Sequence, residues 1–132
     1  MSIDETRKVL EAYWQDHDAR YVAEDAVFLM QPTGEEIRGR QSIAEHLAGF
    51  HHGALDAKTI RTNAIFGDGQ GVFEGRVVGR HTGEFAGVPA TGRNVDVPLC
   101  VTYNLSGGLI KQARIYLMVN VLLAQITRAN QR

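Results

Sequence analysis

Apolar residues recur every three or four positions over residues 3–16, and this spacing predicts an amphipathic helix. Ser2 precedes that segment and suits the N-cap, because its hydroxyl can accept a hydrogen bond from a free backbone N–H of the first turn. The helical spacing returns over residues 41–52, where Gly53 suits a C-terminal cap. A shorter helical piece is expected near residues 19–23. The N-terminal part of the chain therefore supplies the predicted helices.

From residue 58 onward apolar and polar residues alternate, which is typical of strands with one buried face. Ten of the fourteen glycines lie between Gly67 and Gly108, where they suit turns and strand bends. We predict strands at residues 26–30, 37–39, 58–66, 70–82, 94–105 and 109–120, with hairpin turns at 67–69 and 106–108. Helices followed by a long meander predict an α+β fold, in which a strongly curved antiparallel sheet carries helices on one face.

Length and composition narrow the class of protein. The 132 residues suit one domain over residues 1–132, large enough for a core with a pocket. Fourteen Lys and Arg against fifteen Asp and Glu give a net charge of −1, which argues against nucleic-acid binding. The sequence has no apolar run of membrane-spanning length and no signal-peptide pattern, so we expect a cytoplasmic protein without membrane contact. Cys100 is the single cysteine, which excludes an internal disulfide and a cysteine-based zinc site.

The strongest family signal is the segment HTGEFAGVPATGR at residues 81–93. It resembles the signature of SnoaL-like proteins, the polyketide-cyclase or ester-cyclase branch of the NTF2-like superfamily. The resemblance continues at residues 23–28, 38–43, 107–110 and 122–125, in the order in which the family carries these segments. It therefore covers most of the chain.

This resemblance implies an NTF2-like cone-shaped α+β barrel, in which a curved sheet wraps around a pocket and the N-terminal helices close it. Members are commonly homodimers, and some catalyse aldol ring closure of polyketides. Relatives isomerise ketosteroids, open epoxides or only bind ligands. The implied partner is a hydrophobic small molecule, and we expect neither a cofactor nor a metal. Because one fold serves several functions, the resemblance predicts the fold more sharply than the chemistry.

The positions at which the family and its relatives carry acid–base aspartates hold other residues here. The last-strand aspartate of SnoaL-like cyclases corresponds to Met118, and the aspartates of ketosteroid isomerases correspond to Met30 or Gln31 and to Cys100. A thioether cannot transfer a proton. Either the acid–base group lies elsewhere in this chain, or the protein binds its ligand without turnover.

Alternation along the last strand puts Arg114, Tyr116 and Met118 on one face, and the resemblance turns that face toward the pocket. The candidate acid–base residues are His17, His46, His51 and Tyr116. The candidate substrate-binding residues are Tyr13, Trp14, Met30, Phe50, Phe85, Cys100, Thr102, Arg114, Tyr116 and Met118. Histidine suits the acid–base role because its ordinary pKa is near neutrality. Each candidate also has a plain structural alternative, such as helix-on-sheet packing for Tyr13 and Trp14.

Three functions stay open at this point. The first is a cofactor-free cyclase or isomerase of a hydrophobic polyketide-like or steroid-like ketone, with a relocated acid–base group. The second is a non-catalytic protein that binds a hydrophobic ligand in a pocket rich in methionine. The third is a dimerisation or accessory domain without a ligand.

Overall fold

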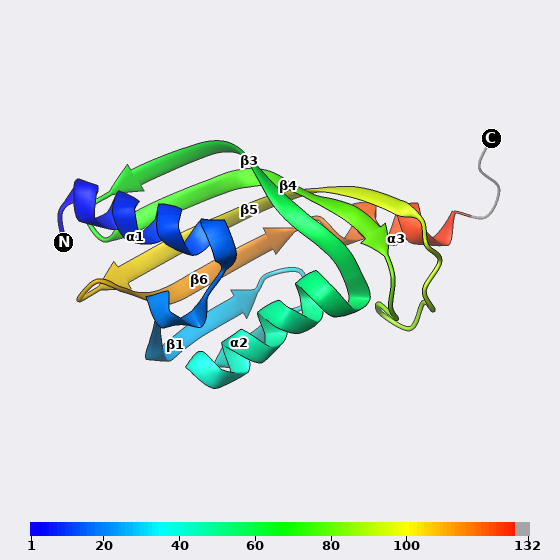
Figure 1. Cartoon of the computed structure of the whole chain (residues 1–132), viewed down its shortest axis with the longest axis horizontal. Coiled ribbons are helices and arrows are strands. Elements are labelled where there is room, and N and C mark those ends of the chain that lie inside the picture. The colour runs from blue at the N-terminus through cyan, green and yellow to red at the C-terminus, as the bar shows by residue number, and fades with distance from the viewer. Residues whose placement is uncertain (129–132) are drawn as a thin grey trace.

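The computed structural model describes residues 1–128, apart from the side chains of His51 and His52. Along the chain it consists of α1 (Ile3–Asp16), η1 (Ala19–Tyr21), β1 (Val22–Met30), β2 (Glu35–Arg38), α2 (Arg40–Gly49), η2 (Phe50–Ala54), β3 (Leu55–Gly67), β4 (Gln70–His81), β5 (Asn94–Ser106), β6 (Leu109–Leu117) and α3 (Val119–Thr127). Helices α1 and α2 lie over one face of a curved sheet, and α3 lies near the end of the sheet that is distant from α1 (Figure 1). The predicted α+β fold is therefore confirmed.

The sheet has the strand order β2-β1-β6-β5-β4-β3 and is open, with β2 and β3 at its two edges. Neighbouring strands are antiparallel except β1 and β6, which are parallel. The sheet is thus mixed, whereas the sequence predicts an antiparallel one. The reason is that α2 carries the chain from β2 to the far edge, so that the returning meander of β3 to β6 ends beside β1.

The predicted first helix forms with the expected bounds. Its N-terminus is a capping box, in which the Ser2 hydroxyl accepts from the Glu5 backbone N–H at 3.1 Å and the Glu5 carboxylate accepts from the Ser2 N–H at 2.9 Å. One face of the helix buries Leu10 and Tyr13 against the sheet. The helix ends at His17, whose φ of 53° is in the left-handed region that normally favours glycine.

Several predicted bounds are wrong, among them the start of β3, which lies at Leu55 rather than at residue 58. The last strand ends at Leu117 rather than at residue 120, and an unpredicted helix, α3, follows it. This helix forms because Leu122 and Ile126, one turn apart, are both fully buried in the same apolar cluster as Leu117. The first strand begins at Val22, four residues before the predicted start, and α2 gives way at Phe50 to a single π-helical turn.

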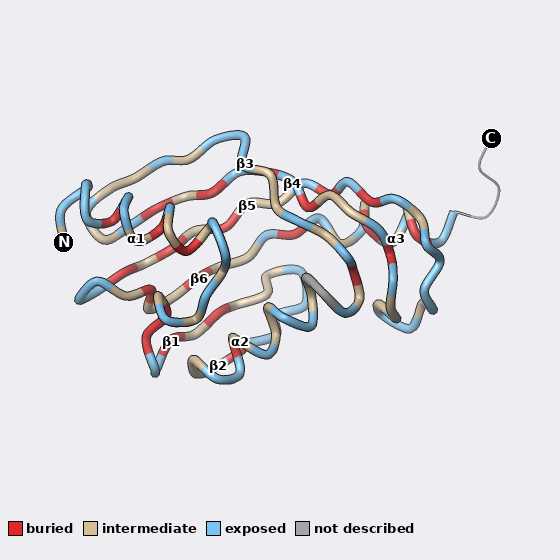
Figure 2. The backbone as a smooth tube through the Cα atoms, in the orientation of Figure 1, coloured by how far each residue is buried: buried red, intermediate tan, exposed pale blue. Residues whose placement is uncertain are grey.

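Buried and exposed positions alternate along the long strands, and this alternation defines the two faces of the sheet (Figure 2). On β6 the buried residues are Ile110, Ala113 and Leu117, which are 0%, 0% and 4% exposed, whereas Tyr116 is 44% exposed. Arg114 donates hydrogen bonds to Asn104 and Gln112, at 2.9 Å each. The face that carries Arg114, Tyr116 and Met118 is therefore the outer one, and its predicted inward orientation is wrong.

Candidate functional site

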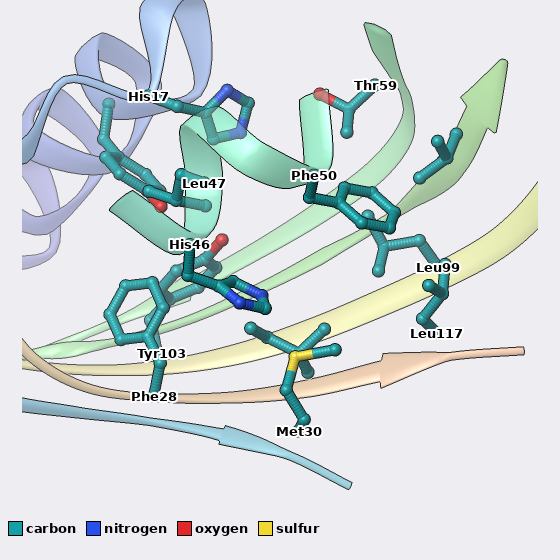
Figure 3. A pocket seen from close by; sticks show the side chains of 13 residues that line it. His17, Phe28, Met30, His46, Leu47, Phe50, Thr59, Leu99, Tyr103 and Leu117 are labelled. Carbon is teal, nitrogen blue, oxygen red and sulfur yellow. The ribbon is translucent and has the colours of Figure 1, made fainter. Parts of the chain in front are cut away.

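A chamber of about 60 Å³ lies between the inner face of the sheet and helices α1 and α2. Thirteen side chains from both layers line it (Figure 3), and most of them are apolar: Tyr13, His17, Phe28, Met30, His46, Leu47, Phe50, Thr59, Val77, Leu99, Tyr103, Ile115 and Leu117. Alternate residues of a strand point to the same face, so the strands contribute one wall of the chamber, which we call its floor. An apolar chamber with a few polar groups is the usual form of a small-molecule site.

Two tyrosine hydroxyls belong to this chamber. Tyr13 from α1 and Tyr103 from β5 are 1% and 5% exposed, and their rings meet edge to face with centroids 6.0 Å apart. Burial raises the pKa of both hydroxyls, and the neighbouring Tyr103 raises the pKa of Tyr13 further. Both groups therefore keep their protons at neutral pH and act as hydrogen-bond donors.

His46 brings an imidazole into the chamber from α2. Its ring extends toward the floor, on the side of Met30 (Figure 3). Burial lowers the pKa of His46 below its ordinary value, and the carboxylate of Glu35 opposes this shift more weakly. The imidazole is therefore mostly neutral at pH 7 and has a lone pair with which it can accept a proton.

His17 is the second histidine of the chamber. It caps α1 and its ring meets Tyr13 edge to face, with centroids 5.0 Å apart. Together with Leu47 and Thr59 it also borders a wider cleft outside the chamber. His17 therefore stands where the chamber meets that cleft.

Of the residues predicted from sequence, the chamber brings together Tyr13, His17, Met30, His46 and Phe50. The side chain of His51 lies outside the described residues. Trp14 lies beside the chamber, where its ring packs against those of Phe66, Phe73 and Tyr103. Phe85 lies in the loop between β4 and β5 and packs instead on the apolar cluster that contains Leu117, Leu122 and Ile126.

The other predicted binding residues lie on the outer face of the sheet: Cys100, Thr102, Arg114, Tyr116 and Met118. Cys100 pairs with Glu74 across β4 and with Tyr116 across β6. Partial burial raises the pKa of its thiol, and the nearby Glu74 carboxylate adds to the rise, so the thiol stays protonated at neutral pH. Side chains alternate between the two faces of a sheet. When the inner face of β6 is assigned one residue out of step, every residue predicted to line the pocket from that strand lies on the outer face instead.

Sequence reasoning missed eight of the thirteen lining residues: Phe28, Leu47, Thr59, Val77, Leu99, Tyr103, Ile115 and Leu117. A signal for several of them was present in the alternation itself. Leu99 and Tyr103 continue the buried series Val95, Val97 and Val101 on β5, which is the more apolar of its two faces. The prediction instead followed the family resemblance, which implied that the opposite face of the sheet lines the pocket.

Two further findings concern metal-ligating groups and membrane-spanning helices. Among the described residues, no group of histidine, cysteine, aspartate or glutamate side chains is arranged to hold a metal ion. None of the helices in the described part of the chain is both long and apolar enough to cross a membrane.

A family model for SnoaL-like polyketide cyclases matches residues 4–126. The chain belongs to that family. A comparison with curated proteins finds no match to this sequence. The SnoaL-like assignment therefore rests on the family model and on the fold, and both cover nearly the whole chain.

Solved structures share this SnoaL-like fold at low sequence identity. One is a protein from a Jannaschia species that is described as a SnoaL-like polyketide cyclase. It superposes with a TM-score of 0.87 at 15% identity, covering 96% of this chain and 94% of that one. A protein with a ketosteroid isomerase-like fold from Catenulispora acidiphila, in complex with trimethylamine, gives 0.73 at 19% identity, covering 92% and 93%. A phenazine biosynthesis-related protein from Pseudomonas aeruginosa gives 0.79 at 18% identity, covering 98% and 85%. These similarities establish the fold.

Proposed function

We propose that this SnoaL-like protein is a cofactor-independent cyclase or isomerase of a hydrophobic ketone, with His46 as its acid–base group. The observation that supports it best is the half-buried imidazole of His46 in a chamber that also holds the hydroxyls of Tyr13 and Tyr103. Enolisation needs a base near the carbon acid and donors near the developing oxyanion. The chamber contains residues of both kinds, although the family's aspartate position holds Met118.

In this mechanism the neutral imidazole of His46 takes a proton from the carbon next to the ketone. The electron pair of the broken C–H bond forms the enolate, whose oxygen accepts hydrogen bonds from Tyr13 and Tyr103. In a cyclase the enolate carbon attacks a second carbonyl of the same molecule, and the imidazolium returns its proton to the new alkoxide. In an isomerase the proton returns to a different carbon. Either route regenerates neutral His46.

The test follows the exchange of the α-protons of acetone for deuterium in heavy water by NMR. We expect the wild type to accelerate exchange over buffer, and His46→Gln to lose about 10²-fold or more of that acceleration. Tyr103→Phe removes a hydroxyl from the chamber, whereas Tyr116→Phe removes one from the outer face and serves as its matched control. Exchange that His46→Gln leaves unchanged would contradict the assignment of the base.

The second candidate is a binding protein without turnover, which the predominantly apolar lining favours. It predicts that acetone raises the unfolding temperature of the wild type while its α-protons do not exchange faster than in buffer. Acceleration of exchange that disappears in His46→Gln excludes this candidate.

We further propose that the protein is a homodimer that pairs through the outer face of the sheet, as the family resemblance implies. Among the described residues no helix covers this face, and it exposes 44% of Tyr116 and 45% of Met118. Exposed apolar side chains grouped on one surface favour a protein partner. Sedimentation equilibrium of the wild type and of Tyr116→Lys tests this: we expect the wild type at twice the monomer mass and the variant shifted to monomer. A wild type that is monomeric at micromolar concentration contradicts the dimer.

A further inference from the structure

The chamber adjoins a second cavity, with which it shares three lining residues. The second is a cleft of about 350 Å³ outside the chamber, between the end of α1, helix α2 and strand β3. His17, Leu47 and Thr59 line both cavities, one residue from each of these three elements. We call these three residues the neck. The neck is where a ligand would pass from the cleft into the chamber.

The two cavities differ in size and polarity. An apolar cavity of about 150 Å³ in an engineered protein core binds benzene, whereas the chamber offers about 60 Å³. It accepts at most a small group unless its side chains move. The cleft is several times larger, and its lining combines polar residues such as Gln15 and Asp16 with apolar ones such as Trp14 and Ala48. A large apolar ring system does not fit the chamber, and in the cleft it would lie partly against polar side chains.

The backbone at the neck supports a role for His17 in ligand binding. His17 is one of two non-glycine residues with positive φ in the described part of the chain, and it occupies a helix C-cap where glycine carries no steric penalty. A strained residue persists where the surrounding structure holds it, and such positions are common at ligand-binding sites. Here the imidazole ring of the strained residue, His17, packs on Tyr13 and borders both cavities.

We propose that the substrate has two parts: a compact apolar carbonyl end that enters the chamber, and a longer polar part that passes through the neck into the cleft. Leu47 and His17 then determine how large an end is accepted. This inference rests on the proposed function, because it concerns the same chamber. The proposed substrate is not a fused polycyclic compound, because the small chamber does not accommodate one.

The test compares two synthetic probes that carry the same hydroxyethylamide arm. One ends in a methyl ketone and the other in a decalone ring, so that only the size of the end differs. Isothermal titration gives the affinity of each. We expect the wild type to bind the methyl ketone probe about tenfold or more tightly than the decalone probe. We also expect 2-pentanone, which lacks the arm, to bind about tenfold more weakly than the methyl ketone probe.

Variants at the neck sharpen the test. Leu47→Ala enlarges both the neck and the chamber that Leu47 lines, and it should reduce the ratio of the two affinities by about threefold or more. Leu123→Ala, which truncates another half-buried helical leucine away from the chamber, is the matched control and should leave the wild-type ratio unchanged. His17→Gly relieves the backbone strain, so it should keep the fold while weakening the methyl ketone probe. A purely structural His17 would leave that affinity unchanged.

Each outcome decides for or against the inference. Equal affinity of the wild type for the two probes, no binding of either, or an unchanged ratio in Leu47→Ala overturns it. The proposed acid–base function fails in a different way, through the absence of α-proton exchange in a probe that does bind. Selective binding of the methyl ketone probe without exchange therefore supports the two-part ligand and rejects the enzyme.

Discussion

Two adjacent residues at the end of β6 give the sharpest test of the fold, because the structure assigns them to opposite faces. Leu117 is 4% exposed, lines the chamber and belongs to the apolar cluster with Leu122 and Ile126. Met118 is 45% exposed and makes no side-chain cap bond to α3. If the family's polar pattern set the facing of this strand, Met118 would be the buried residue of the pair.

The expected cost of each truncation follows from burial. Leu117→Ala removes a buried isobutyl group beside existing free space, so the site cannot collapse fully, and we expect a loss of about 3 kcal/mol of unfolding free energy. Met118→Ala removes a half-exposed side chain and should cost less than about 0.5 kcal/mol. In a domain of this size the first change lowers the unfolding temperature by roughly 10 °C. Domain stability is typically about 5–15 kcal/mol, so both variants should remain folded.

Urea unfolding followed by circular dichroism measures both values, and equal denaturant slopes for the two variants show that the comparison is sound. A loss in Met118→Ala that equals or exceeds that in Leu117→Ala would refute the facing of β6. The description of the chamber would fail with it, since Ile115 and Leu117 would then point away from His46.

Three further predictions concern the site, the sheet and the first helix. The rate of α-proton exchange should rise with pH as His46 loses its proton, with a half-maximal point below pH 6.5 because burial lowers the pKa of His46 from that value; a midpoint above it in the pH–rate profile contradicts the assignment. Gly75→Ala would bring a Cβ within 2.1 Å of the Ile60 carbonyl oxygen, so it should cost more than about 4 kcal/mol and abolish cooperative thermal unfolding, while Gly67→Ala, whose nearest contact is 3.9 Å away, should unfold like the wild type. Ser2→Ala removes the capping box and should cost about 1 kcal/mol in urea unfolding, and no change would show that the helix end contributes nothing.

The sequence alone determined the elements whose signals are local. The helical spacing and the cap at Ser2 predicted α1 with its observed bounds, and the glycine turns at 67–69 and 106–108 predicted both hairpins. The family segment at residues 81–93 predicted the α+β fold. Tyr13, on the buried face of α1, was also expected in the pocket, and it lines the chamber. These features depend on residues a few positions apart, and short spacings are visible in a linear chain.

Tertiary structure decided what depends on distant contacts. The inward face of β6 is set by packing of Leu117 against α3, and the pattern of one strand does not say which of its two faces meets that helix. The pairing of β1 with β6 joins segments more than eighty residues apart and makes the sheet mixed. The presence of His46 and Tyr103 in one chamber, and the neck beside it, likewise require α2 to fold over the strands. Contacts between residues that are far apart in the sequence cannot be predicted from their spacing, because they depend on the three-dimensional path of the chain.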